Sequence, residues 1–518
     1  MRLFLMLSAS AAMLALPAAE NGRSVSNARI EDQQSSVDGP VEGDPVGMAD
    51  GAVYDAVTDI RVPCPDIDLV FRRSYGSWSQ RGGSLGVGWT HTYDWRVETN
   101  SYMVSVFSAG ENGVTDGVHK FAPVPPGGSV FNKDGYELKS SADGLLSVVT
   151  PEKVVYSFGE EGRLERISSW NGSFVSLARD PASGCLVRAE HSSGKSLYIV
   201  SDEGGRIVKV QTPDPDVWVG YTYETNNSGT TTVLLSGVTV HCGLSMSERR
   251  YEYEEVLRPG TYPIHSVSAY RVKGPNDHAS FPTYKSVLMG KFALSRKVDA
   301  NGMETSYSYC RDGDSLNVKC VATEMSGGLF SFAFTYPSPW SVGPWTHADR
   351  KIGPVKVRRT YSFDTLKREV QRWGGGETLR KYYDEAGNLS GTKLSDDGTG
   401  RYVMSEFRYD AFHRVVAKAV AYGAQPRRFE EIAWDDLTGA PRRRVSKAGR
   451  VSEWVRGGQS YTVYGAGTND SRLVSSVSCD SRWRPVSAVG PDGGETRFSY
   501  GADGLVSRVE ADGAPSVT

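Results

Sequence analysis

Cysteine is scarce in this 518-residue chain: there are six, and no two of them stand in a C-x-x-C spacing. Structural zinc sites and thiol redox motifs use such closely spaced pairs, so the sequence contains no signal for either. Cys310 and Cys320 form the one close pair. A β-hairpin would bring these two residues together as a disulfide, while buried free thiols are the other interpretation.

Sequence patterns of common catalytic sites are also missing. There is no Gly-x-Ser-x-Gly, no P-loop and no dinucleotide-binding fingerprint. The eight histidines are scattered, and the adjacent pair His241 and Cys242 is insufficient for a metal site. Paired carboxylates such as Asp66 and Asp68 could serve a glycosidase, but such pairs arise by chance in a chain with 61 acidic residues. We therefore expect a protein that is not an enzyme, with no catalytic residue, no metal and no cofactor.

Neither sign of charge is in excess, since 58 Lys and Arg face 61 Asp and Glu and the formal net charge is −3. A nucleic-acid-binding protein needs a basic face that displaces counterions from phosphates. A local basic run at Arg442–Arg444 has Asp435 and Asp436 close by in the sequence, and we interpret it as a solvated strand edge. We therefore expect no nucleic-acid partner.

Long apolar runs are absent except at the N-terminus, where Leu3–Leu16 is almost entirely apolar. This run is too short to span a bilayer comfortably, and it lies between an arginine and a Pro-Ala-Ala segment, as in a signal peptide. We interpret residues 1–19 as a signal peptide and expect a secreted, periplasmic or cell-surface protein that is not integral to the membrane. An uncleaved anchor and a misassigned start are the alternatives. Residues 20–43 are polar, lack apolar periodicity and are predicted to be a disordered linker.

The chain is rich in glycine (57 residues) and tyrosine (26 residues), a composition that favours short strands joined by tight turns. In Arg163–Ile167 polar and apolar residues alternate, as in a strand with one buried face. The hairpin dipeptide Asn171-Gly172 follows at once. The best helix candidate, from Phe429 to Leu437, is short. We therefore predict an all-β fold.

A loosely periodic unit recurs in the second half of the chain, with aromatic key positions at residues 363, 383, 409 and 434. Its clearest copies, Tyr382–Leu389 and Phe407–Val415, combine alternating aromatics, an aspartate, then glycine or arginine, and an aliphatic residue. We expect the aromatics to stack on neighbouring hairpins, Asp410 to cap its turn and Gly387 to adopt positive φ. One such hairpin cannot bury its apolar face alone, so the units are predicted to stack into a repeat array of antiparallel hairpins.

These units resemble the YD repeats of rearrangement hotspot (RHS) and teneurin proteins. A second resemblance precedes them, because residues 44–96 are similar to the conserved N-terminal domain of unknown function that often precedes RHS repeats. Its most specific segments are Phe-Arg-Arg-x-Tyr at Phe71–Tyr75 and Leu-Gly-x-Gly-Trp-x-His at Leu85–His91. The resemblance divides the chain into an N-terminal β domain at 44–135 and YD-type hairpin repeats at 136–518.

The resemblance implies a spiralling sheet that forms a partial hollow shell, in which His91 is a packed residue of the fold and not a general base. In bacterial members such a shell often encloses a C-terminal toxin and ends in a self-cleaving segment around a DPxG-type motif. Here the nearest fragment, Gly490–Gly493, is an ordinary lead-in to a repeat, and no toxin-like domain follows. We therefore expect a non-catalytic shell or scaffold, a truncated or orphan relative of polymorphic toxins, whose partner is an encapsulated polypeptide.

The alternative function is a secreted surface module for adhesion, which binds a glycan or a protein at the cell surface. Tryptophans can stack on sugar rings, although the aromatics inside YD repeats more often pack against one another. The candidate tryptophans are Trp78, Trp170, Trp218, Trp340, Trp345, Trp454 and Trp483.

Overall fold

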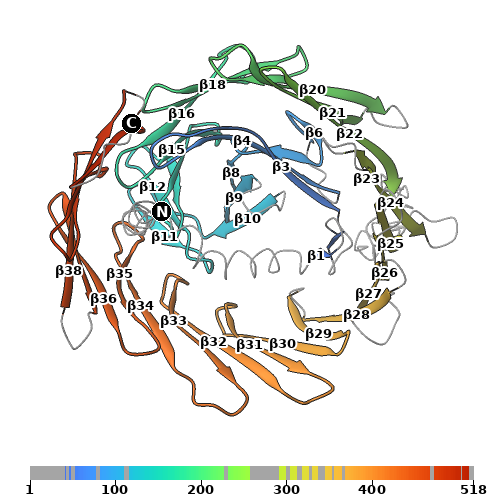
Figure 1. Cartoon of the computed structure of the whole chain (residues 1–518). Helices are drawn as coiled ribbons and strands as arrows, with labels where there is room; N and C mark the ends of the chain where they lie inside the picture. The colour runs from blue at the N-terminus through green and yellow to red at the C-terminus, as the bar shows by residue number, and fades with distance from the viewer. Residues whose placement is uncertain are drawn as a thin grey trace, which may run out of the picture.

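The computed structural model describes residues 41–42, 46–47, 53–77, 82–109, 116–226, 232–256, 291–298, 304–311, 318–325, 330–335, 345–352, 355–364, 368–466, 472–502 and 504–512. The predicted signal peptide lies outside these residues, and so does the predicted linker except for Val41–Glu42, which forms strand β1. Every regular element in these ranges is a β-strand, which confirms the predicted all-β fold (Figure 1).

The segment from Phe429 to Leu437, the best but short helix candidate in the sequence, forms strand β34 (Phe429–Trp434) followed by a turn, in keeping with the all-β prediction. Ile432 and Trp434 are buried, whereas the residues beside them are half-buried or exposed. This period of two is the burial pattern of a strand with one face in a core.

The N-terminal β domain is built from short strands in small antiparallel sheets. β1 pairs with β2 (Val46–Gly47), and β5 (Gly82–Gly83) pairs with β6 (Gly86–Val87). One three-stranded sheet contains β3 (Tyr54–Val62), β4 (Leu69–Gly76) and β7 (Trp89–His91), and the other contains β8 (Arg96–Thr99), β9 (Val104–Ala109) and β10 (Asp116–Phe121).

A sheet of 31 described strands follows, in which each strand pairs with its neighbours in sequence and all pairs are antiparallel. It is therefore a continuous meander of hairpins, as the repeat pattern predicts. It begins at Ser129, within the range predicted for the N-terminal domain. Its strands are β11 (Ser129–Phe131), β12 (Glu137–Ser140), β13 (Leu146–Val149), β14 (Val155–Phe158), β15 (Leu164–Ser168), β16 (Phe174–Arg179), β17 (Leu186–His191), β18 (Ser196–Ser201), β19 (Ile207–Gln211), β20 (Val217–Asn226), β21 (Thr232–Cys242), β22 (Ser245–Val256), β23 (Lys291–Val298), β24 (Glu304–Arg311), β25 (Val318–Met325), β26 (Phe330–Thr335), β27 (Trp345–Ile352), β28 (Val355–Phe363), β29 (Glu369–Gly374), β30 (Glu377–Tyr383), β31 (Leu389–Asp396), β32 (Tyr402–Tyr409), β33 (Val415–Tyr422), β34, β35 (Pro441–Val445), β36 (Val451–Gly457), β37 (Ser460–Ala466), β38 (Arg472–Cys479), β39 (Pro485–Val489), β40 (Glu495–Tyr500) and β41 (Val506–Ala511).

The large sheet curls into a ring around the N-terminal domain (Figure 1). Strands β3, β4 and β8 to β10 lie inside the ring, and the last strands, drawn in red, return to the side of β12 and β16. One hydrophobic cluster joins domain residues such as Leu69 and Trp95 to sheet residues such as Leu138 and Val210. The N-terminal domain therefore supplies much of the core on which the first half of the sheet packs.

The repeat turns are capped by aspartates, as the sequence predicts. Asp410 Oδ1 accepts hydrogen bonds from the backbone N–H groups of Phe412 and Arg414, both at 2.9 Å, and Oδ2 accepts one from Arg414 Nε at 2.7 Å. Gly387 has the predicted positive φ, at 88°, but His413 and Trp483 reach 60° in the equivalent position without being glycine. The aspartate-to-arginine arrangement recurs in the pairs Asp202/Arg206, Asp364/Arg368 and Asp480/Arg484.

Each of these turns is tied to the next repeat by the aromatic residue that precedes the next turn. Tyr409 Oη donates a hydrogen bond to the carbonyl of Leu389 at 2.8 Å, and Tyr500 Oη donates one to that of Pro485 at 2.6 Å. In both cases the acceptor is the first residue after the preceding turn. The guanidinium of Arg484 also lies 4.4 Å from the centre of the Tyr500 ring. The aromatics thus stack on the neighbouring hairpin and also fix its register.

Turns of the later repeats contact the first strands and turns of the large sheet along a seam, which we define as Phe131, Lys153, Trp170, Phe412 and Trp483. The rings of Phe131 and Phe412 are 5.4 Å apart, and so are those of Trp170 and Trp483. Lys153 Nζ lies 5.4 Å from the Phe412 ring centre. Within the described strands, β11 and β41 do not pair with each other. The ring is therefore closed by side chains and not by a ladder of backbone hydrogen bonds.

Cys310 and Cys320 lie on the adjacent strands β24 and β25 and are direct register partners. The predicted hairpin between them is confirmed, and their disulfide stays a prediction.

Candidate functional site

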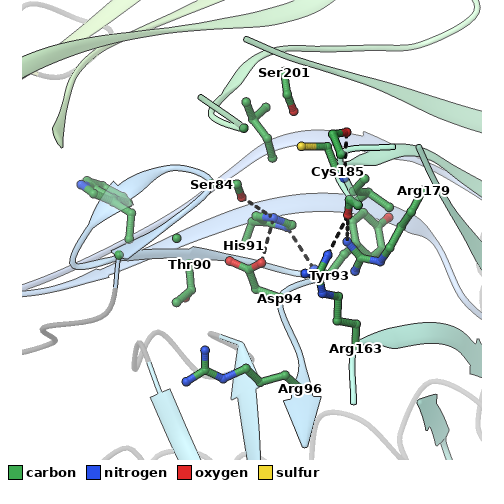
Figure 2. Close-up of a pocket in the computed structure, with 18 of the residues that line it drawn as sticks. Ser84, Thr90, His91, Tyr93, Asp94, Arg96, Arg163, Arg179, Cys185 and Ser201 are labelled. Atoms are coloured by element: carbon green, nitrogen blue, oxygen red, sulfur yellow. Dashed lines mark hydrogen bonds and ion pairs between the residues drawn. The ribbon is translucent and has the colours of Figure 1, made fainter. Parts of the chain in front are cut away.

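The Leu-Gly-x-Gly-Trp-x-His segment forms one wall of a pocket between the N-terminal domain and the large sheet (Figure 2). Gly86 has φ 91° and lies against β21, where a Cβ atom would come within 2.9 Å of the Val233 carbonyl oxygen. Gly88 has φ 81°, and a Cβ atom there would lie 2.7 Å from the Tyr75 ring. Both positions require glycine, and the turn that they allow carries His91 to the pocket wall.

His91 is buried and held from both ends of its ring. Its Nε2 lies 3.0 Å from Ser84 Oγ and 3.2 Å from Asp94 Oδ1, and its Nδ1 accepts a hydrogen bond from the backbone N–H of Tyr93 at 3.2 Å. The ring also stacks on Phe71, with the centroids 4.9 Å apart. Because Nδ1 accepts a hydrogen bond from the backbone N–H of Tyr93, the imidazole proton is assigned to Nε2.

This geometry differs from that of a nucleophilic triad. A Ser-His-Asp triad needs the hydroxyl on one ring nitrogen and the carboxylate on the other. Here Ser84 and Asp94 share Nε2, and the second nitrogen is occupied by the backbone of Tyr93. The arrangement suits a packed histidine that holds the segment in shape.

The opposite wall of the pocket carries arginines. The cavity has a volume of about 390 Å³, and its charged lining residues are three arginines and one aspartate. Arg163 Nη1 donates to the Gly184 carbonyl at 2.9 Å, and Arg179 Nη1 approaches the same oxygen at 3.4 Å (Figure 2). Burial and the nearby Arg163 lower the pKa of Arg179, and its buried Nε has no hydrogen-bond partner among the described residues.

A second polar cluster lies deeper, at the buried junction of the domain with the sheet. Arg73 Nε and Asp59 Oδ2 are 2.8 Å apart, and both side chains are 0% exposed. Arg73 Nη1 donates to Tyr251 Oη at 2.7 Å, and Tyr221 Oη donates to Asp59 Oδ2 at 2.9 Å. Burial raises the pKa of Asp59, an effect that Arg73 and Tyr221 oppose. This cluster fastens β3 and β4 to β20 and β22.

The remaining signature residues serve the same junction. Trp89 Nε1 donates to Tyr253 Oη at 2.9 Å, and the backbone N–H of Leu294 donates to Tyr75 Oη at 3.0 Å. The Phe-Arg-Arg-x-Tyr and Gly-Trp-x-His segments are therefore docking elements for the repeats, and Trp89, Thr90 and His91 also line the pocket.

Two other sets of residues singled out in the sequence have structural partners. Asp66 accepts hydrogen bonds from Asn171 and Ser173, and Asp68 pairs with Arg61. Asp435 caps its own turn, and Asp436 pairs with Arg414. Neither acidic pair lines the pocket described above, as the two carboxylates of a glycosidase would line its cleft.

The candidate tryptophans are distributed over separate elements. Trp170 and Trp483 face each other in the seam, and Trp218 stacks on His241 with the centroids 5.1 Å apart. Trp345 lies on β27 and Trp454 on β36. Trp78 and Trp340 lie outside the described residues.

The pocket arginines were not identified as site residues from the sequence. Arg96, Arg163 and Arg179 belong to three separate segments among 58 basic residues, so no spacing links them. The alternation around Arg163 predicts a solvent-facing side chain, and that side chain is indeed 48% exposed while it lines the pocket.

Two further properties concern the described part of the chain. It contains no group of three or more His, Cys, Asp or Glu side chains placed to hold a metal ion. Nor does it contain a helix with the length and apolarity needed to cross a membrane.

In comparisons with known proteins, a family model matches the start of the chain and solved structures match most of its length. A family model described as a domain of unknown function (DUF6531) matches residues 43–115, a range that contains both signature segments. No curated protein matches the chain. Among solved structures it is similar to TcdB2-TccC3 at 11% identity and a TM-score of 0.36, over 93% of this chain and 28% of that one. It is also similar to a Photorhabdus luminescens Tc holotoxin pore with a TccC3 mutation, at 10% identity and a TM-score of 0.25, over 91% of this chain and 26% of that one. The chain thus spans little more than a quarter of the length of these structures.

Proposed function

We propose that this protein is a non-catalytic scaffold of the RHS/YD-repeat kind, related to polymorphic toxins, that encloses or carries another polypeptide. The observation that carries the proposal is the single meander of 31 described strands, which curls around the N-terminal domain and is closed by the seam. Such a sheet places a long inner surface around one central domain, an arrangement suited to holding a chain and not to turnover.

The contacts of the residues in the two signature segments support the same non-catalytic function. The side chains of Arg73, Trp89 and Tyr75 make hydrogen bonds at the junction between the domain and the sheet. His91 lacks the geometry of a general base in a triad. We propose that the protein acts outside the cytoplasm, on the basis of the signal-peptide pattern at 1–19.

The proposal is tested by protease protection of the protein purified from its source cells. We expect native mass spectrometry to detect a second polypeptide, or a longer continuous chain, and we expect that extra segment to resist protease while the scaffold is folded. The Trp483→Gly variant, which removes the seam contact with Trp170, should speed cleavage of the segment relative to the wild type. A mass equal to the 56.4 kDa chain less its signal peptide, with no protected segment, would refute the enclosing role.

A surface-binding module is the second candidate function, and exposed aromatics on the repeats favour it. Tyr382 and Tyr422 are 45% and 63% exposed. A glycan array with the wild-type protein and a Tyr382→Ala, Tyr422→Ala variant tests this role. Binding that the double variant loses would support adhesion, and an array without any specific signal would exclude glycans as the ligand.

A further inference from the structure

We propose that the pocket between the N-terminal domain and the large sheet binds a carboxylate group, held by Arg163 and Arg179. The ligand is either a small monocarboxylic acid or the free C-terminus of a peptide, which present the same group. This site goes beyond the scaffold function and does not depend on it.

The first argument is the local balance of charge. The chain as a whole carries a formal charge of −3, yet the pocket is lined by three arginines against one aspartate. Arg96 and Arg163 also pair with Glu98 and Glu161, but these glutamates are 56% and 78% exposed and do not line the pocket, so solvent screens their charges. That aspartate, Asp94, lies 3.2 Å from His91 Nε2 on the wall opposite Arg163 and Arg179 (Figure 2). A partly enclosed site with this excess of positive charge attracts an anion more strongly than the same charges in open solvent.

The second argument is that two positively charged side chains share one neutral hydrogen-bond acceptor. Both Arg163 and Arg179 direct an Nη1 group to the Gly184 carbonyl, at 2.9 and 3.4 Å. The other described bond of Arg179, from Nη2 to the Leu164 carbonyl, is also 3.4 Å long, and its buried Nε has no described partner. Buried donors in native proteins are nearly always satisfied, by a ligand or by water where protein groups do not suffice.

A carboxylate fits these requirements. It has two oxygens with about four acceptor positions, and it matches the planar fork of a guanidinium in two parallel hydrogen bonds. One carboxylate would therefore place a negative charge beside the two positively charged guanidinium groups and give their Nη groups, which now share the Gly184 carbonyl, a stronger acceptor. The volume of about 390 Å³ lies in the range of small-molecule sites.

The position of Asp94 further limits which carboxylates can bind. A second anionic group at the far end of the ligand would lie toward Asp94 and be repelled by it. The His91 side of the pocket also offers the Ser84 hydroxyl, which suits a neutral polar group. We therefore expect monocarboxylates to bind more tightly than dicarboxylates of similar length.

Isothermal titration of the full chain tests the site with four probes: butyrate, N-acetylglycine and their neutral amides. Butyrate represents a small acid, and N-acetylglycine represents the C-terminus of a peptide. The probe that binds more tightly therefore identifies which of the two kinds of ligand the site prefers. We expect one saturable site per chain for at least one acid and none for either amide. The Arg163→Gln and Arg179→Gln variants should each weaken binding about tenfold to a hundredfold, the effect of losing a charge-assisted hydrogen bond.

Arg188→Gln is the matched control, since Arg188 lies on neighbouring β17, pairs with Glu190 and is not part of the pocket lining. It should bind like the wild type. Circular dichroism shows whether each variant folds. Arg163 is 48% exposed, so Arg163→Gln should fold and can test the site even if Arg179→Gln does not fold. Equal binding of acids and amides, no binding of either acid, or wild-type affinity in Arg163→Gln would each overturn the proposal. The scaffold function is unaffected by any of these outcomes, because it is measured by protease protection.

Discussion

Replacing Arg73 by methionine tests how the N-terminal domain is held within the ring. The guanidinium and the Asp59 carboxylate are both fully buried, with Nε and Oδ2 2.8 Å apart. Removing one partner of a buried ion pair leaves an uncompensated charge and typically costs about 3–5 kcal/mol. The change also removes the hydrogen bond to Tyr251 and the contact with the Trp89 ring at 4.9 Å, each worth about 1 kcal/mol. We expect a loss of about 5–7 kcal/mol, a large part of the stability of an ordinary domain.

The double variant Arg73→Met, Asp59→Asn separates the charge effect from the loss of packing. Asparagine removes the carboxylate but still presents an oxygen to the Tyr221 hydroxyl, which donates to Asp59 at 2.9 Å. We expect the double variant to recover about 2 kcal/mol or more relative to Arg73→Met, because no charge is left unpaired in the interior.

The dependence on pH follows from the same pair. Burial raises the pKa of Asp59, and Arg73 opposes that shift, so its removal raises the pKa further. A carboxyl group whose folded pKa lies above its unfolded value stabilises the folded state at low pH, and this contribution is lost as the pH rises through the folded pKa. The cost of Arg73→Met should therefore be smaller at about pH 5 than at about pH 8, and this difference should vanish in the double variant.

Urea unfolding followed by circular dichroism and tryptophan fluorescence measures these costs. Arg61→Met is the control within the same domain, because Arg61 is 64% exposed in its pair with Asp68 and its loss should cost less than about 1 kcal/mol. A cost of Arg73→Met as small as that of the control, or no recovery in the double variant, would refute the role given to the buried pair.

Three other changes test the repeats, the seam and a buried histidine. Trp483→Gly places glycine at a φ of 60°, which glycine tolerates, but it removes the ring contact with Trp170. We expect a loss of about 1 kcal/mol in the free energy of unfolding and faster amide exchange confined to the seam. Unchanged exchange in the seam would contradict this. Asp410→Ala removes two backbone caps and an ion pair with Arg414 and should cost about 2 kcal/mol, measured by thermal unfolding. Asp492→Ala is the comparison, because it removes a single backbone cap from Gly494 and should cost less than about 1 kcal/mol. Burial lowers the pKa of His119 to about 4, so the folded state loses stability as the pH falls from about 6.5 toward 4, by up to about 3 kcal/mol. His119→Phe should flatten that decline, and a decline of equal size in the variant would exclude His119 as its cause.

The turns of the repeats could be predicted from the sequence because their chemistry is local. An aspartate that caps the next few N–H groups and a glycine at positive φ need only neighbouring residues, and both Asp410 and Gly387 behave as predicted. The bond from Tyr409 to the Leu389 carbonyl could not be predicted, because it depends on the register between hairpins 20 residues apart.

The pocket could not be predicted from the sequence, for a different reason. His91 belongs to a recognisable segment, but its partners on the opposite wall, Arg163 and Arg179, come from turns and strands of the large sheet. They meet His91 only because the sheet packs on the N-terminal domain. Long-range packing of this kind leaves no spacing signal in a chain whose basic residues are evenly matched by acidic ones.

Closure of the ring depends on curvature that accumulates over many strands, since each pair of strands adds a small twist. Trp483 holds a φ of 60°, a conformation that costs a residue other than glycine about 1 kcal/mol. Its ring contacts both Trp170 across the seam and Tyr461 on its own side. An unfavourable backbone is thus retained where a large aromatic joins the two ends. Separating adjacent strands elsewhere in the ring breaks a ladder of backbone hydrogen bonds, whereas opening the seam breaks side-chain contacts. The seam is therefore where the ring should open first.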